Sequence, residues 1–486
     1  MSPQATNTRS SIAWVVVLTA IGSFMGALDT LVVSTALPTI RLDLGASVSE
    51  LEWTVNAYNL AFAVMLVTAA ALGDRFGRRR LYAAGLVGFA GASAASALSQ
   101  NVGMLIAARA VQGVGAAFMM SLGLALLSAA FPAEKRGTAI GLYSAVTGLA
   151  VASGPVVGGA VVNGLDWTWI FWLNVPIGLI AAPLAVARMR ESYGPNTALD
   201  LPGLGLVSAG AFGLVWGLVR GNSAGWDSPE VVVTLAAGAL LIAAFVTYER
   251  RAKDPMIPIS FFRSRAFSAG NLAIFTVFGS LFGEVYFFSQ FLQTGLGYDV
   301  LGAGLRLVPW TATFLIVGPI AGAMADRIGE RPLMVTGLLI QAAATIWIAL
   351  HASADMSYGE FVVPVIVAGI GISMAIPSAQ NSVLGSVSQE AVGKAAGTNS
   401  VMRELGGVFG IAIAVAVFAG AGSYATPQTF VDGFGPAAGV AAALALVGAV
   451  AGSFLPGHDS EAELITAARA SAPALETEGL PRVMNP

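Results

Sequence analysis

The stretch Leu72-Gly73-Asp74-Arg75-Phe76-Gly77-Arg78-Arg79-Arg80 occurs a second time, in weaker form, as Ala325-Asp326-Arg327-Ile328-Gly329-Glu330-Arg331. The two aspartates lie 252 positions apart, and in each copy the Asp-Arg-x-Gly core follows a long apolar run. A repeated charged turn between membrane-length segments indicates a duplicated membrane protein.

The composition of the whole chain agrees with this interpretation. Of its 486 residues, 56% are hydrophobic and 10% are charged, and the mean hydropathy is +0.77. Soluble globular chains carry about 25% charged residues. The chain therefore has too few charges to cover a surface that faces water, and we predict an all-α polytopic membrane protein.

The same counts argue against several kinds of chemistry. The chain has no cysteine, so it forms no disulfide, thiol nucleophile or thiolate metal site. Its two histidines, His351 and His458, lie at the end of an apolar segment and beyond the last one, which argues against a histidine relay or metal centre. A net charge of −3 offers no basic field for nucleic acid, and no P-loop is present. We therefore expect no enzyme, no cofactor and no resident metal.

The apolar runs predict about fourteen membrane-spanning segments, at about 20 mostly apolar residues per span. We place them near 13–36, 53–72, 81–99, 104–126, 138–162, 169–188, 203–220, 231–248, 267–291, 302–324, 333–351, 361–384, 398–420 and 436–455. On this map most of the 24 Lys and Arg residues lie in loops and tails on one side of the membrane. The positive-inside rule then predicts an inner-membrane protein with both termini in the cytoplasm.

The repeat offset also divides the chain. A shift of 252 positions carries Gly154 and Gly158 onto Gly406 and Gly410, whereas Arg109 falls on a phenylalanine and has no counterpart. Parallel six-helix halves are a known transporter architecture, with the substrate site at the midplane between them. The predicted parts are an N-terminal half at 1–190, two inserted spans with a cytoplasmic linker at 191–262, a C-terminal half at 263–456 and a disordered tail at 457–486.

Charged residues inside predicted spans are candidates for function. Asp29 lies in the first span, within Leu28-Asp29-Thr30-Leu31-Val32-Val33-Ser34-Thr35-Ala36-Leu37-Pro38. An aspartate there costs about 2.5–3.5 kcal/mol on insertion scales, so it is expected to face a cavity or a partner. The alternative is an aspartate that is hydrogen-bonded within the bundle only for packing.

Arg109 lies in the fourth span, within Leu105-x-x-x-Arg109-x-x-Gln112-Gly113-x-Gly115. An arginine keeps its charge in proteins and therefore needs a partner, for which Asp29 is the first candidate. The alternative is a structural arginine that is bonded to backbone carbonyls.

Predicted spans of the second half contain further acidic and basic residues. Glu284 is about one helical turn beyond the repeat image of Asp29, so we expect these two acids to face each other across the cavity. Arg403 and Glu404 are expected to pair with each other, with lipid headgroups or with the Asp74 loop.

Together these motifs resemble the fourteen-helix drug:proton antiporter branch of the major facilitator superfamily, from about residue 13 to 455. The segment Gly148-x-x-x-x-x-Gly154-Pro155-x-x-Gly158-Gly159 is similar to the antiporter signature of exporters in this family. Close helix packing alone is the alternative explanation of these glycines. The resemblance implies the major facilitator fold, with two pseudo-symmetric six-helix bundles and two inserted central helices.

The resemblance also implies roles for individual residues. It assigns proton coupling to Asp29 and Arg109, and we add Glu284 to them because an acid inside a membrane span is a candidate for function by default. It assigns gating to the two charged turns, through Asp74, Arg75, Gly77, Arg78, Asp326, Arg327 and Gly329. Simple positive-inside anchoring by the turn arginines is the alternative. Candidates for the wall of the substrate cavity are Tyr58, Gln112, Tyr286, Phe287 and Gln293.

The expected function is proton-coupled export of drug-like or antibiotic-like small organic molecules from a bacterial cell. The proton gradient drives this transport, the substrate is lipophilic or cationic, and the lipid bilayer surrounds a monomer. A proton-coupled importer with the same fold is the alternative.

Overall fold

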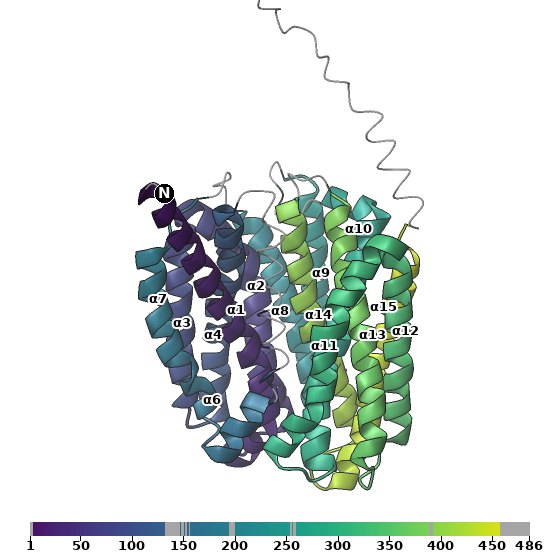
Figure 1. Ribbon diagram of the computed structural model, residues 1–486. Helices are drawn as coiled ribbons and strands as arrows, with labels where there is room; N and C mark the ends of the chain where they lie inside the picture. Colours follow the sequence, from purple (N-terminus) through teal and green to yellow (C-terminus); the bar gives the residue numbers. More distant parts are fainter. Residues whose placement is uncertain are drawn as a thin grey trace, which may run out of the picture.

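Long helices make up nearly all of the chain that the computed structural model describes, which is residues 3–131, 146, 150, 153–154, 156–193, 200–252, 255, 259–387 and 392–456. No β-strand occurs in these residues. The predicted tail at 457–486 and most of the predicted fifth span lie outside them. Figure 1 shows the helices side by side, as two bundles with a further pair between them.

The first bundle contains the N-terminal helices. They are α1 (Pro3–Leu44), α2 (Val48–Phe76), α3 (Arg78–Ala97), α4 (Val102–Ala130), α6 (Trp169–Trp172) and α7 (Asn174–Arg188). Residues 156–164 are also helical and belong to the predicted fifth span.

The second bundle contains the C-terminal helices. They are α10 (Arg265–Gln290), the π-helical turn η2 (Phe291–Gly295), α11 (Val300–Ile328), α12 (Glu330–His351), α13 (Tyr358–Gly385), α14 (Val392–Ala421) and α15 (Pro427–Ser453). A short 3-10 helix, η1 (Ile259–Arg263), precedes this bundle. The inserted helices are α8 (Leu201–Ala224) and α9 (Pro229–Glu249), and α8 packs against both α2 and α14.

Eleven helices of the described chain are long and apolar enough to cross a membrane, and a twelfth is reached if the bent α2 counts as one span. Helix α3 is not among them, because it is rich in Gly, Ala and Ser and begins with three arginines. The structure thus supports an all-helical, multi-pass membrane protein, whereas the predicted total of fourteen spans stays a prediction.

Side-chain caps explain where many of these helices begin. The hydroxyl of Ser47 accepts a hydrogen bond from the backbone of Glu50, whose carboxylate bonds back to the backbone of Ser47. Ser357 and Glu360 form the same reciprocal pair at the start of α13. Such caps satisfy backbone N–H groups that have no partner inside the helix.

The two copies of the charged turn have the same backbone geometry. Gly77 joins α2 to α3 with φ of +108°, and Gly329 joins α11 to α12 with φ of +84°. Each glycine also donates its N–H to the carbonyl four residues earlier, at 3.0 Å and 2.9 Å respectively. Residues with side chains rarely adopt positive φ, which explains the glycine in both copies.

Glycines also allow close packing within each half. A Cβ atom added at Gly406 or at Gly410 would lie 2.1 Å from a backbone oxygen of α10. In the first half, a Cβ at Gly154 would lie 2.6 Å from the Cβ of Leu31, and one at Gly158 would lie 3.2 Å from a Cα of α1. These glycines of the repeat therefore pack against the first helix of their own half, as small-residue spacing in membrane helices permits.

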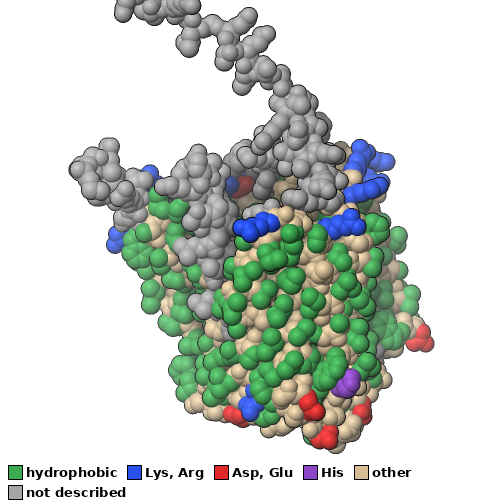
Figure 2. All heavy atoms as spheres, turned by 45° about the vertical axis from the view of Figure 1, so that its right-hand side comes forward, with side chains coloured by type: hydrophobic (Ala, Val, Ile, Leu, Met, Phe, Trp, Pro, Cys, Tyr) green, Lys and Arg blue, Asp and Glu red, His purple; other side chains and the backbone are tan. Residues whose placement is uncertain are grey.

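Charges are separated along the helix axes. Figure 2 shows Lys and Arg side chains gathered toward one end of the bundle and acidic side chains mainly toward the opposite end. We call the end that carries the turn at Arg78–Arg80 the basic end, and the other the acidic end. At the acidic end the two halves touch. There the guanidinium of Arg41 lies 4.7 Å from the ring centroid of Tyr424, and Gln293 Nε2 donates to a backbone oxygen of α1 at 3.0 Å.

Candidate functional site

A buried ion pair lies at the centre of the first bundle. Arg109 on α4 is fully buried, and its Nη1 donates to Asp29 on α1 and, at 2.7 Å, to Gln112 Oε1. The other Asp29 oxygen accepts from Gln112 Nε2 at 2.8 Å and from Asn174 Nδ2 at 3.2 Å. Both of these amides also donate to Ser93 Oγ at 3.2 Å. The carboxylate therefore has a cationic partner and two amide donors, as burial of a charge requires.

The arginine is held from other sides as well. Its Nε donates to the backbone oxygen of Thr54 at 3.1 Å, and its guanidinium lies 4.2 Å from the ring centroid of Tyr58. The expected pairing of Arg109 with Asp29 is therefore present. The alternative of a bond to a backbone carbonyl is present too, through the backbone oxygen of Thr54.

The second bundle holds its own acid, Glu284, which is 1% exposed. Its Oε1 accepts from Thr345 Oγ1 at 2.8 Å and from Gln341 Nε2 at 3.2 Å, and Gln341 also donates to Ser280 at 2.6 Å. Within the described chain no Lys or Arg forms an ion pair with Glu284. Within the described chain, the buried acid of the first half is therefore paired with a cation and that of the second half is not.

The repeat is still visible in these two networks. Ser93 and Thr345 lie 252 positions apart, on α3 and α12, and each places a hydroxyl in the polar network around the acid of its own half. The arginine is the part that was not duplicated. Within the described residues, Glu284 therefore has a hydroxyl partner, as in the first network, but no counterpart of Arg109.

The expectation that Asp29 and Glu284 face each other across a cavity is wrong. Asp29 turns toward α4 and α7 of its own half, and Glu284 turns toward α12 of the other half. Neither acid lines the pocket between the halves. The reason is that each acid satisfies its hydrogen bonds inside its own bundle, which sequence spacing alone does not reveal.

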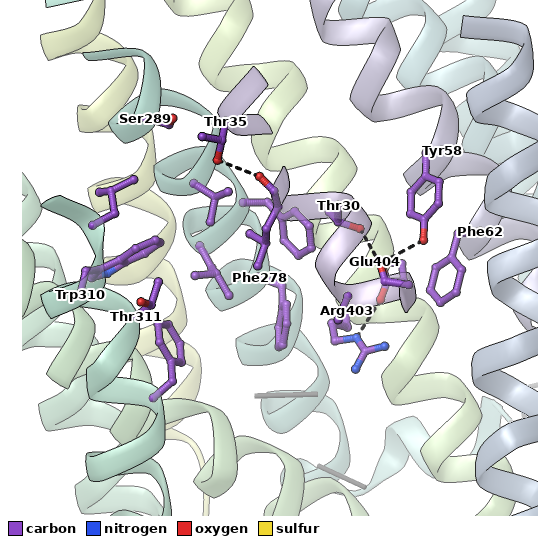
Figure 3. Close-up of a pocket in the computed structure, with 18 of the residues that line it drawn as sticks. Thr30, Thr35, Tyr58, Phe62, Phe278, Ser289, Trp310, Thr311, Arg403 and Glu404 are labelled. Atoms are coloured by element: carbon purple, nitrogen blue, oxygen red, sulfur yellow. Dashed lines mark hydrogen bonds and ion pairs between the residues drawn. The ribbon is translucent and has the colours of Figure 1, made fainter. Parts of the chain in front are cut away.

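The pocket between the halves has a cavity volume of about 130 Å³ and mostly apolar walls. Figure 3 shows Tyr58 and Phe62 on one side of it and Phe278, Trp310 and Thr311 on the other. The lining comes from α1, α2, α4, α10, α11 and α14. It consists of Gly26, Ala27, Thr30, Leu31, Thr35, Tyr58, Phe62, Met120, Phe278, Leu281, Phe282, Val285, Ser289, Leu307, Trp310, Thr311, Phe314, Arg403 and Glu404.

Of the five residues expected to line a cavity, Tyr58 does so. Gln112 belongs instead to the network around the buried ion pair. Tyr286 and Phe287 are 0% and 2% exposed in the interior of the second bundle, and Gln293 bonds to α1 where the halves meet. The α10 residues that do line the pocket include Phe278, Phe282 and Ser289, on a neighbouring face of the helix. Both faces are apolar, so hydrophobicity did not distinguish them.

Arg403 and Glu404 were not predicted as cavity residues, yet both line the pocket. Arg403 Nε donates to Glu404 Oε1 at 2.8 Å, so the expected pairing of these two residues with each other is present. An adjacent pair of opposite charges inside an apolar span is the sequence signal from which this position could have been predicted.

At the basic end, Asp74 accepts a hydrogen bond from Arg78 Nε at 2.7 Å. The carboxylate at the start of α3 is Glu191, which follows α7 and accepts the backbone N–H of Arg79 at 2.8 Å. A Cβ atom at Gly77 would lie 2.8 Å from this carboxyl group. Glu191 was missed because it lies more than a hundred residues away in the sequence.

The remaining predicted gating and signature residues are only partly described. Arg75 and Arg327 are exposed, whereas the side chain of Asp326 lies outside what the structure describes. The signature positions Gly148 and Pro155 also lie outside the described residues. Of that motif, Gly159 is described and sits against α11, where a Cβ atom would lie 2.8 Å from the backbone oxygen of Val300.

Two similar helical bundles, a cavity between them and a buried acid in each define a polytopic membrane transport protein. The chain belongs to the Major Facilitator Superfamily, whose sequence model matches residues 19–411 and 270–480. The prediction of this family is thereby confirmed, and so is the expectation that the protein is a transporter and not an enzyme.

Similar proteins agree with this assignment. The tetracenomycin C resistance and export protein of Streptomyces glaucescens is 34% identical over 396 residues, which are 81% of this chain and 73% of that protein. The methylenomycin A resistance protein of Bacillus subtilis (strain 168) is 32% identical over 410 residues, covering 84% and 88% respectively. Among solved structures, a peptide transporter POT in complex with sulfate has a TM-score of 0.67 at 15% identity, covering 91% of this chain and 96% of that one. Both of these relatives are named as antibiotic resistance proteins, and the structural likeness shows the fold.

Proposed function

We propose that this protein exports drug-like or antibiotic-like small organic molecules across the cytoplasmic membrane in exchange for protons. The observation that carries the proposal is the aromatic pocket between the two halves, in a chain whose relatives bear the names of antibiotic export proteins. The pocket lies where alternating access requires a substrate site, since the halves of such transporters rock about it.

The membrane topology belongs to this proposal. Twelve described spans, with the bent α2 counted as one of them, make fourteen together with α3 and the predicted segment at 138–162. We place the basic end in the cytoplasm by the positive-inside rule. The first helix then begins on the cytoplasmic side, and an even number of spans returns the chain to that side.

Proton coupling is proposed to use the two buried acids differently. Glu284 has no cationic partner within the described chain, and an unpaired carboxylate is costly to bury, so we assign it as the group that holds a proton. Asp29 is already neutralised by Arg109, and it would take a proton only when that pair separates. Asp74, Glu191 and the turn arginines are proposed to hold the cytoplasmic gate.

Purified protein in liposomes tests this proposal, with wild type compared with Asp29→Asn, Glu284→Gln and the double variant. We expect export driven by a pH difference in the wild type and a loss of that dependence in Glu284→Gln. Full pH-driven export by both single variants and by the double variant would remove these acids from the mechanism. Flux in the opposite direction, with protons and substrate entering together, would favour the importer instead.

A further inference from the structure

The ion pair of Arg403 and Glu404 is part of the pocket wall. Both residues lie on α14, and the Glu404 side chain is 9% exposed while that of Arg403 is 25% exposed. Within the described chain, the Glu404 carboxylate accepts one hydrogen bond, and its donor is Arg403 Nε. Figure 3 shows this pair on the side of the pocket where Tyr58 and Phe62 lie.

No other charged residue of the described chain lines the pocket. Asp29 and Glu284 lie behind its wall, each inside its own bundle. The two charges at the wall cancel, so the pocket has no net charge of its own. It nevertheless presents a carboxylate that accepts hydrogen bonds and a guanidinium that donates them.

This arrangement disfavours charged ligands. A cation gains the full attraction of Glu404 only by replacing Arg403, and an anion gains that of Arg403 only by replacing Glu404. Either event leaves one charge of the pair without its partner in an apolar wall, which is costly. The aromatic walls attract cations in general, but the guanidinium of Arg403 already lies 5.7 Å from the ring centroid of Phe278. An uncharged ligand can bond to both members and leave the pair intact.

The walls also favour flat ring systems. The rings of Tyr58 and Phe62 are parallel within 1° on one side, and Trp310 and Phe314 meet edge to face on the other. Aromatic side chains stack well on planar molecules. The remaining polar side-chain groups of the wall are hydroxyls, such as those of Thr30 and Thr311, and the indole N–H of Trp310.

We propose that Arg403 and Glu404 make the pocket selective for planar aromatic molecules that carry no net charge and have neighbouring hydroxyl and carbonyl groups. This inference rests on the proposed function, because it specifies the substrate class of the same pocket. It also narrows the expectation of a lipophilic or cationic substrate to an uncharged one.

Three anthraquinones with one shared ring system test the charge selectivity. They are a neutral dihydroxyanthraquinone, a cationic trimethylammoniomethyl-anthraquinone and an anionic anthraquinone sulfonate. Binding to the full-length protein in detergent is measured by quenching of tryptophan fluorescence. Because Trp310 lines the pocket, Trp310→Phe shows which part of the signal comes from it. We expect the wild type to bind the neutral compound about tenfold more tightly than either charged one, a difference of about 1.4 kcal/mol.

Two variants should shift this preference in opposite directions. Arg403→Gln leaves Glu404 without its partner and is expected to raise the affinity for the cation relative to the neutral compound about tenfold. Glu404→Gln leaves Arg403 without its partner and is expected to raise the affinity for the anion relative to the neutral compound about tenfold. A gain of binding cannot be produced by misfolding, so either gain supports the proposal directly.

The charge-exchanged double variant, Arg403→Glu with Glu404→Arg, restores a neutral pair and is expected to restore preference for the neutral compound. It decides the matter if a single variant does not fold. Preference of the wild type for the cation or the anion, or an unchanged preference in every folded variant, would overturn the inference. Selective binding of the neutral compound without proton-driven export would leave the inference standing and remove the proposed function.

Discussion

The buried pair of Arg109 and Asp29 gives a quantitative prediction. Replacement of Arg109 by Gln removes two charge-assisted bonds, to Asp29 and to Gln112, and a third to the backbone of Thr54. The Asp29 carboxylate, 3% exposed, is then left with amide donors only. Removal of one partner of a buried pair costs about 3–5 kcal/mol, because the other charge stays buried without compensation.

The matched change Asp29→Asn is expected to cost a similar amount, since it leaves the guanidinium without its carboxylate. The double variant should cost much less than the sum of the two single changes, because it buries no charge. We therefore expect a coupling free energy of at least about 2 kcal/mol in the double-mutant cycle. Reversible unfolding in mixed micelles, followed by far-ultraviolet circular dichroism, measures these free energies.

Arg220→Gln serves as the control, because the pair of Arg220 with Glu230 is 38% and 40% exposed and should matter little. The reasoning would be refuted if each single change at the buried pair cost less than about 1 kcal/mol, or if the two costs simply added.

Three further changes have distinct expected outcomes. Gly410→Val should destabilise the protein by about 3 kcal/mol, because its Cβ would lie 2.1 Å from a backbone oxygen of α10. Gly439→Val is the matched control in the same unfolding assay, because a Cβ atom there would have no neighbour within 4 Å. Glu191→Gln should cost about 1 kcal/mol, because it removes a negative charge from the N-terminus of α3; equal stability of variant and wild type would contradict this role. Glu284→Gln should fold as stably as the wild type, since an amide keeps the bonds to α12, while proton release on substrate binding, read with a pH indicator in weak buffer, should disappear.

The sequence was sufficient for the parts of the fold that follow from local pattern. Apolar length predicted the helices, and the spacing of Asp-Arg-x-Gly predicted two equivalent turns, which the positive φ of Gly77 and Gly329 bears out. The need of a buried arginine for a counter-charge was also enough to pair Arg109 with Asp29. Each of these inferences depends either on the local sequence of one helix or on the need to neutralise one buried charge.

The remaining parts of the site depend on how the helices are rotated. In a membrane protein the lipid-facing, core-facing and cavity-facing sides of a helix are all apolar, so hydrophobic periodicity does not separate them. Tyr286 and Phe287 were therefore chosen from α10, whereas Phe278 and Phe282 line the pocket. Glu191 was missed for a related reason, because a cap supplied by a distant segment leaves no local pattern.

Transport in everted membrane vesicles tests the central claim most directly. Respiration acidifies the lumen of such vesicles, so an exporter that exchanges substrate for protons should accumulate the neutral dihydroxyanthraquinone inside them. The account predicts accumulation that requires the pH difference, disappears with a protonophore and is lost in Glu284→Gln. Accumulation that persists after the pH difference is collapsed, or that occurs only in right-side-out vesicles with protons moving inward, would contradict it.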